Sequence, residues 1–178
     1  MSYSPVLDEI KYYKHTYEDW EQPVLTSATS SKKVTITSTS DYDGGYANWR
    51  VFDGGSAPWL SGNGTGQGSI RMQFPRPLKI SKISVTGWSN PNGGTGYGTI
   101  YKDFNNTEVI GATQYFGGWV ERVWTFDTPI LTDKLSFYIT GTGMWGCASE
   151  INITAQEQLV TETTEAEAEW SERIIKVY

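Results

Sequence analysis

The stretch from Tyr46 to Ser61, YANWRVFDGGSAPWLS, decides how the rest of the sequence is interpreted. It places Trp49, Phe52 and Trp59 around Asp53, which is followed by two glycines. An aspartate in this position usually accepts hydrogen bonds from the amides of a tight turn. The stretch contains no histidine or lysine that would make the aspartate catalytic. We therefore expect an aromatic loop that packs as a lid on one end of a β-structure.

The composition favours a single all-β domain. The chain has 178 residues, of which 19% are charged and 14% aromatic, and its 19 glycines suit short strands joined by tight turns. The net charge of −6 disfavours nucleic acid as a partner, because a phosphate-binding surface needs a basic excess. No apolar window is long enough for membrane insertion. The N-terminus lacks the features of a secretory signal, and the single cysteine, Cys147, excludes an internal disulfide.

Residues 27–155 contain a succession of short segments in which apolar and polar residues mostly alternate. Such alternation is typical of strands with one buried and one solvated face, as in antiparallel sheets. Turn-rich stretches with glycine, asparagine and aspartate separate the segments. The sequence therefore predicts an antiparallel β-sandwich, with strands near residues 34–37, 69–74, 80–85, 99–101, 123–126, 135–139 and 150–153.

The two ends of the chain differ in composition from this region. Residues 1–26 form a predicted N-terminal arm for attachment or packing, and a short helix is expected there because Ile10, Tyr13, Tyr17 and Trp20 recur at helical spacing. Residues 156–178 form an acidic linker and an apolar tip. The tip fits a helix with Leu159, Ala166, Trp170, Ile174 and Val177 on one face, or a strand added to the sheet of another chain.

Catalytic constellations are scarce in the sequence. The only histidine, His15, lies in the N-terminal arm, and Cys147 lies in an apolar context that raises the pKa of a thiol. We expect a binding protein rather than an enzyme. A glycosidase remains an alternative, because two of the carboxylates Asp41, Asp43, Asp53, Glu121 and Glu150 could meet in space.

Several motifs, taken in order, resemble one family. Residues 46–54 followed by Trp59-Leu60-Ser61 are similar to the A-W-x-A-F-D-G…W-x-S signature of the discoidin or factor V/VIII type C domains, which have a galactose-binding-like fold. Residues 69–77 and 80–85 match the next strands, residues 126–129 the F-x-x-P turn, and residues 148–153 the closing I-x-E-I-x-V strand. The hairpin usual in the family is shortened here to residues 101–108.

The resemblance implies a jelly-roll sandwich that presents loops from one end and performs no chemistry. Members of the family bind carbohydrate, lipid headgroups or proteins, and many hold a structural calcium ion near the F-D-G loop. The matching residues here are Asp53, Ser56 and Glu150, whose oxygen ligands suit calcium. A hydrogen-bonded Asp53 and Glu150 without a metal is the alternative.

A sugar site needs an exposed aromatic ring against the apolar face of a pyranose, and polar groups that fix the hydroxyls. The loops supply these candidates: Trp88, Asn90, Asn92, Tyr97, Tyr115, Trp119 and Trp145. Packing within the protein is the alternative for each tryptophan, and Trp124 is expected in the core.

These observations predict a non-catalytic carbohydrate-binding or adhesion domain. Because domains with this motif are frequent on bacteriophages, we expect a surface subunit of a virion that binds bacterial surface polysaccharide. Its termini would attach it to other virion proteins within an oligomer or larger assembly. The alternative is a structural decoration or adaptor subunit that binds neighbouring proteins and no glycan.

Overall fold

The computed structural model describes residues 12–62, 66–88, 96–141 and 145–163. Within them, the chain forms eight strands and two short 3-10 helices. In chain order these are β1 (Tyr12–Asp19), β2 (Thr35–Ser38), η1 (Gly44–Tyr46), η2 (Asn48–Phe52), β3 (Trp59–Leu60), β4 (Gly68–Trp88), β5 (Gly96–Tyr101), β6 (Gln114–Phe116), β7 (Val120–Gly141) and β8 (Cys147–Thr163). None of the helices in these ranges has the length and apolar character needed to span a bilayer.

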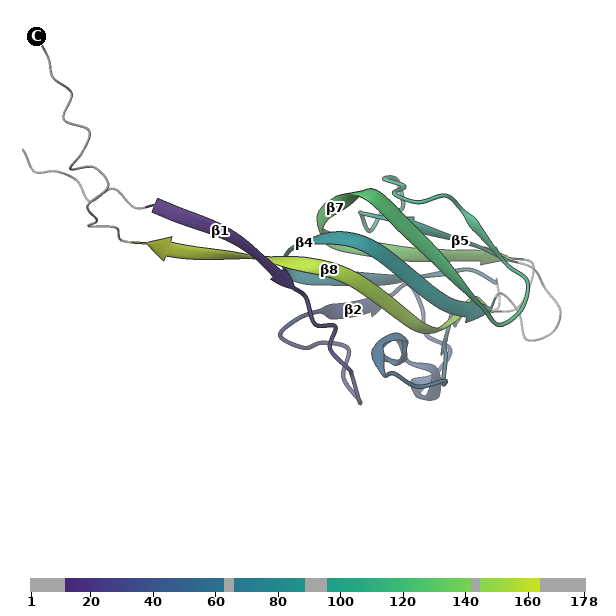
Figure 1. The fold of residues 1–178 in the computed structure, drawn as a ribbon. Helices are drawn as coiled ribbons and strands as arrows, with labels where there is room; N and C mark the ends of the chain where they lie inside the picture. Colours follow the sequence, from purple (N-terminus) through teal and green to yellow (C-terminus); the bar gives the residue numbers. More distant parts are fainter. Residues whose placement is uncertain (1–11, 63–65, 89–95, 142–144, 164–178) are drawn as a thin grey trace, which may run out of the picture.

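Two long, bent strands connect the layers of the sandwich. The first part of β4 pairs with β2 and with the end of β7, which continues to β5 and β6. The second part of β4 pairs with the start of β7 and with β8. The register shifts between Gln73 and Leu78, where Pro75 and Pro77 cannot donate to the ladder. All strand pairs are antiparallel, and the predicted all-β antiparallel sandwich is confirmed (Figure 1).

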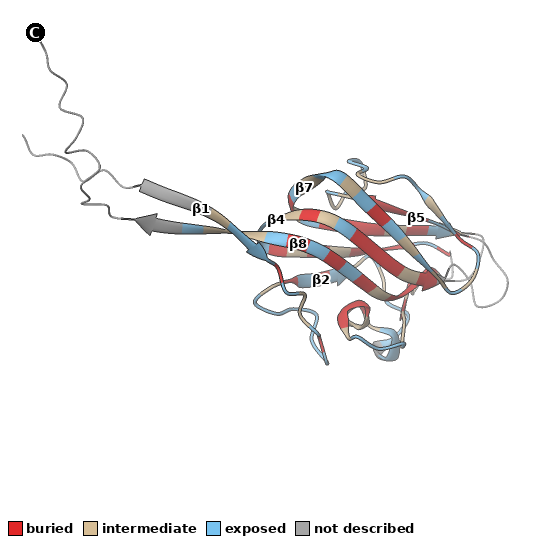
Figure 2. Ribbon diagram, viewed as in Figure 1, coloured by how far each residue is buried: buried red, intermediate tan, exposed pale blue. Residues whose placement is uncertain are grey.

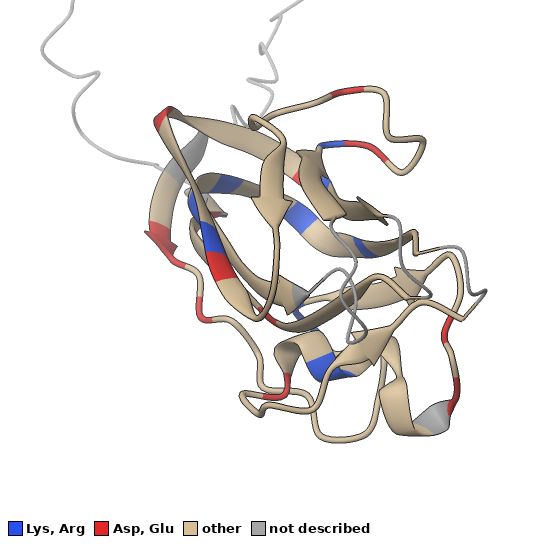
Figure 3. Cartoon of the chain, turned by 90° about the vertical axis from the view of Figure 1, so that its right-hand side faces the viewer, with Lys and Arg blue, Asp and Glu red and all other residues tan. Residues whose placement is uncertain are grey.

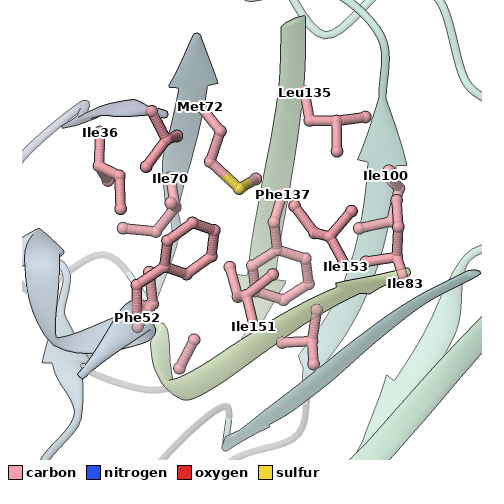
Figure 4. Close-up of a cluster of buried hydrophobic side chains, with 14 of the residues drawn as sticks. Ile36, Phe52, Ile70, Met72, Ile83, Ile100, Leu135, Phe137, Ile151 and Ile153 are labelled. Carbon is pink, nitrogen blue, oxygen red and sulfur yellow. The ribbon is translucent and has the colours of Figure 1, made fainter. Parts of the chain in front are cut away.

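The core lies between the two layers. The alternating residues of the strands turn their apolar side chains inward, and buried positions line the inner faces (Figure 2). Phe52 of η2 joins side chains from β2, β4, β5, β7 and β8 in one cluster (Figure 4). Trp124 is buried as predicted, and its indole N–H donates to the carbonyl of Ala112 at 2.7 Å. Cys147 is also buried, as expected for a structural cysteine.

The prediction of a helix in the N-terminal arm is wrong for the described residues. Residues 12–19 form β1, which pairs along its whole length with residues 156–163 of β8. The tyrosines and threonine of this segment favour an extended strand once a partner strand is present. Trp20 and Leu25 are buried, and Trp20 meets Phe74 edge to face at 5.6 Å. Part of the predicted arm therefore belongs to the core of the sandwich.

The C-terminal segment likewise begins as a strand. β8 runs without interruption from Cys147 to Thr163, across the predicted domain boundary at residue 155. The predicted helix is therefore wrong for residues 156–163, and Leu159 lies opposite Thr16 of β1. Residues 156–163 pair with β1 of the same chain. Ala166, Trp170, Ile174 and Val177 lie outside the described residues.

Candidate functional site

The predicted binding residues that the structure describes gather at the end of the sandwich opposite β1. Trp88, at the end of β4, pairs with Cys147 at the start of β8, and Gly96 at the start of β5 pairs with Gly141 at the end of β7. The amide of Gly146 donates to the hydroxyl of Ser61 at 2.8 Å, which ties the loop before β8 to β3. We call this the loop end. Viewed from the loop end, most of the ribbon is neither acidic nor basic (Figure 3).

Tyr97 and Tyr115 form an exposed aromatic pair beside the loop end. They lie directly opposite each other on β5 and β6, with ring centroids 5.5 Å apart. Gly96 and Gly98 on either side of Tyr97 are buried, because strand alternation turns them toward the core. Tyr97 therefore points outward, and the two residues Tyr97 and Tyr115 are 50% and 42% exposed. Arg122 donates from Nε to the carbonyl of Tyr115 at 2.7 Å, which fixes the backbone under the pair.

A second aromatic cluster includes Trp145. Its ring contacts that of Tyr42 edge to face at 5.5 Å, and Tyr42 in turn contacts Tyr46 at 5.9 Å. The two tyrosines are exposed and Trp145 is partly buried. The sequence did not identify Tyr42 and Tyr46 as site residues. The signal was present in the stretch DYDGGY, where Asp43 caps η1 by accepting from the amide of Gly45 at 2.7 Å and so positions both rings.

The remaining predicted sugar contacts are placed only in part. Trp119 lies in the turn before β7 and is 49% exposed. The backbone of Trp88 is fixed at the end of β4, at the loop end. Asn90 and Asn92 lie outside the described residues.

Residues 48–52 form η2, and the F-D-G sequence ends this helix and begins the turn after it. Asp53 accepts from the amide of Gly55 at 2.6 Å, which is the turn role expected from the sequence. Phe52 and Trp59 are buried, whereas Trp49 is partly buried beneath the guanidinium of Arg50 at 4.8 Å. The indole N–H of Trp59 donates to Asp41 at 2.8 Å. The loop is therefore an aromatic lid, as predicted.

Glu150 and Asp53 form an electrostatically strained pair beneath this loop. Burial, and next the negative charge of Asp53, raise the pKa of Glu150 to about 7, although the amide of Gly54 donates to its carboxylate. The Oε2 atom of Glu150 is buried and has no hydrogen-bond partner. Arg50 supplies a positive charge on the other side, with Nη1 at 3.7 Å from Asp53 Oδ2.

This pair fits a hard cation in part. Two carboxylates, one of which has an unpartnered buried oxygen, are donors of the kind that calcium takes. The third predicted ligand, Ser56, is exposed three positions after Asp53. Among the described residues no group of three or more His, Cys, Asp and Glu side chains is arranged to hold a metal ion. A calcium ion would therefore also need hydroxyl and carbonyl oxygens of the loop.

The sequence comparisons give limited results. No protein-family model matches the sequence. A segment of 70 residues is 37% identical to endopolygalacturonase A of Aspergillus niger. This segment is 38% of the present chain but only 16% of that enzyme, so the chain spans a small part of the curated relatives it matches.

The comparisons of structure cover most of the sandwich. The family 32 carbohydrate-binding module of C. perfringens NanJ, solved with galactose, matches with a TM-score of 0.55 and 21% identity over 70% of this chain and 93% of that one. A pectin-binding module matches with a TM-score of 0.54 and 18% identity over 70% and 91%. A chitosan-binding module from a Paenibacillus sp. IK-5 chitosanase/glucanase matches with a TM-score of 0.53 and 17% identity over 71% and 96%.

These matched chains are binding modules, and each is covered almost completely by the present sandwich. The order of strands, the aromatic lid and the closing strand with Glu150 agree with the motifs from which the resemblance was drawn. The chain therefore has the galactose-binding-like, discoidin-like β-sandwich fold of these carbohydrate-binding modules.

Proposed function

We propose that this protein is a non-catalytic carbohydrate-binding domain that recognises a glycan, such as bacterial surface polysaccharide, at its loop end. The observation that carries the proposal is the Tyr97–Tyr115 pair, in which the rings are close together and each residue is about half exposed. Tyrosine presents an apolar ring and a polar hydroxyl, which suits the faces and hydroxyl groups of a sugar. Matched modules solved with galactose or described as binding pectin or chitosan support a saccharide ligand.

The backbone around the tyrosine pair is built rigidly enough to hold a binding surface. Tyr97 and Tyr115 lie on paired strands, and a side chain at Gly98 would collide with the rings of Phe116 and Phe137 at 2.5 and 2.7 Å. The pair therefore rests on a closely packed core. Preorganised aromatic groups lose little conformational entropy on binding, which favours affinity from a small contact area.

The test is a glycan-array screen of the full chain, followed by calorimetry with the best soluble oligosaccharide. Tyr97→Ala, Tyr115→Ala, Trp119→Ala and Trp145→Ala are compared with Tyr17→Ala, a control with similar exposure at the far end. We expect Tyr97→Ala and Tyr115→Ala to weaken binding by about tenfold or more, equivalent to about 1.4 kcal/mol. A folded protein that binds no glycan, or equal losses in the control, would contradict the proposal.

The calcium site is part of the proposal. Asp53 and Glu150 would supply the carboxylates, and Ser56 with loop carbonyls the remaining oxygens. The ion would neutralise the two charges and stabilise the aromatic lid. The buried, unpartnered Oε2 of Glu150 and the raised pKa of this residue support the proposal.

The virion location is likewise proposed. It is supported by the resemblance of residues 46–61 to domains frequent on bacteriophages. Mass spectrometry of purified particles from the source virus would test it by detecting this chain in stoichiometric amounts. The second candidate, a structural adaptor without a glycan ligand, is favoured by the strand ribbon of β1 and β8, which extends from the sandwich (Figure 1). Absence of glycan binding together with presence in particles would select this candidate.

A further inference from the structure

The ribbon formed by β1 and the end of β8 is an unusual element of the fold. Gln156 and Glu157 still pair with β4, but residues 158–163 have β1 as their only strand neighbour in the described part of the chain. The ribbon therefore projects beyond the two layers (Figure 1). A two-stranded ribbon alone is at best marginally stable in water. This one lacks glycine and proline on both strands, which suits further pairing.

The outer edge of β1 is the edge available for such pairing. β1 is the terminal strand of the sheet, so one of its edges has no partner among the residues described. An edge strand presents unpaired backbone N–H and C=O groups that can accept a further strand. Charged residues and proline often block such edges. β1 has no proline, and its basic residues precede its acidic residues.

The charges along β1 are complementary to a second copy of the same strand. Positions 14 and 15 are Lys and His, and positions 18 and 19 are Glu and Asp. If two copies pair antiparallel about a two-fold axis that passes through Thr16, Lys14 of each copy lies opposite Glu18 of the other. An axis through Tyr17 instead places His15 opposite Asp19. Opposite charges on facing positions stabilise a strand pair, and a parallel arrangement would bring like charges together.

The corresponding part of β8 lacks this property. Residues 158–163 contain one acidic residue, Glu162, and no basic residue, so two copies of this edge would gain nothing from charge. We propose that a second copy of this chain pairs with the edge of β1, antiparallel, and that the protein is a two-fold symmetric dimer with a sheet continuous across the axis. Such an isologous contact is the commonest way in which identical chains associate.

The dimer has a consequence for binding, which rests on the proposed function. Each loop end lies opposite the ribbon of its own chain (Figure 1). In an antiparallel pair of ribbons the two loop ends therefore face away from each other. The dimer would bridge two glycans and would not place both sites on one surface.

The experiment measures the mass of the full chain by sedimentation velocity and light scattering, and uses no glycan. The acidic variant carries Lys14→Glu and His15→Glu, and the basic variant carries Glu18→Lys and Asp19→Lys. We expect the wild type to be a dimer. In each variant alone the dissociation constant of the dimer should rise about tenfold or more, because residues that face each other across the axis then carry like charges. Mixing the two variants restores opposite charges, so a dimer containing one chain of each should form.

The control is the double variant Lys32→Glu and Lys82→Glu, which makes a similar charge change at exposed positions outside β1 and should remain dimeric. Near-ultraviolet circular dichroism confirms that each variant is folded. A wild-type monomer would overturn the proposal and would point to another occupant of the edge, such as residues 164–178. Dimers that persist in both variants alone, or a mixture that forms no mixed dimer, would also overturn it.

Discussion

Replacing Glu150 by glutamine is expected to stabilise the protein at pH 8 when calcium is absent. Burial and the neighbouring Asp53 raise the pKa of Glu150 from 4.5 to about 7. The folded protein therefore binds more protons than the unfolded chain between these two values, so its stability falls as the pH rises across this window. Below pH 4.5 the carboxyl group is protonated in both states and the contribution is fully present. Above pH 7 it is lost.

The size of the effect follows from the same shift. A rise from 4.5 to about 7 corresponds to at most about 3 kcal/mol, at 1.36 kcal/mol for each pKa unit. Because Glu150 is only partly shielded from water, solvent screening reduces this to about 1 to 2 kcal/mol. Glutamine keeps an oxygen that accepts from the Gly54 amide but carries no charge. Glu150→Gln should therefore gain this amount at pH 8 and almost nothing at pH 4.5.

The assay is urea unfolding followed by tryptophan fluorescence at several pH values from 4.5 to 8, with a chelator and then with calcium. Calcium should stabilise the wild type, more at pH 8 than at pH 5.5 because protons compete for Glu150, and should have much less effect on Glu150→Gln. The matched control is Glu121→Gln, an exposed carboxylate on β7. Stability curves of wild type and Glu150→Gln that stay parallel across the window would refute the electrostatic reasoning. Equal calcium responses would refute the metal site.

Three further substitutions test the framework of the site by urea unfolding. Gly98→Ala should lower stability by about 1–3 kcal/mol, because the new methyl group would lie 2.5 Å from the ring of Phe116; an unchanged midpoint would contradict the close packing under Tyr97. Asn106→Ala should cost about 1–3 kcal/mol, since Asn106 bonds to Ser69 and Ser136 and has a positive φ of 57°. Asn106→Gly, which relieves the backbone but not the lost bonds, should recover part of this loss. Trp59→Phe should cost about 1–3 kcal/mol, because it removes the N–H that donates to Asp41; a neutral result would show that this bond is dispensable.

Much of the sandwich was predictable because apolar and polar residues alternate along its strands, and this alternation indicates which side chains are buried. Alternation at residues 69–74 and 135–139 fixes which side chains enter the core, and both segments form adjacent parts of β4 and β7. The bend of β4 could not be located from alternation alone, although Pro75 and Pro77 mark it in retrospect. The turn role of Asp53 followed from local chemistry, and the structure confirms it.

The candidate site was predictable only where a residue type has a strong preference for the surface of a loop or strand. Tyr97 and Tyr115 were named separately, yet their pairing depends on the register of β5 and β6, which no local pattern gives. Tyr42 and Tyr46 were missed because the contact of Tyr42 with Trp145 joins segments about a hundred residues apart, a separation that sequence spacing does not reveal, and Tyr46 in turn contacts Tyr42. The orphaned oxygen of Glu150 is likewise a property of burial and not of sequence.

The helix predicted in the N-terminal arm is wrong for residues 12–19 because it rested on residue spacing alone. Tyr13, Tyr17 and Trp20 recur at helical spacing, but a helix of this length is marginal unless its apolar face packs on something. The strand arrangement pairs one edge of residues 12–19 with residues 156–163 and buries Trp20 against Phe74. Tyr17 remains exposed beside the ammonium of Lys79 at 4.7 Å. A partner strand more than a hundred residues away in the sequence therefore determines that residues 12–19 form a strand and not a helix. The outer edge of β1, which β8 leaves unpaired, is the edge on which the proposed dimer depends.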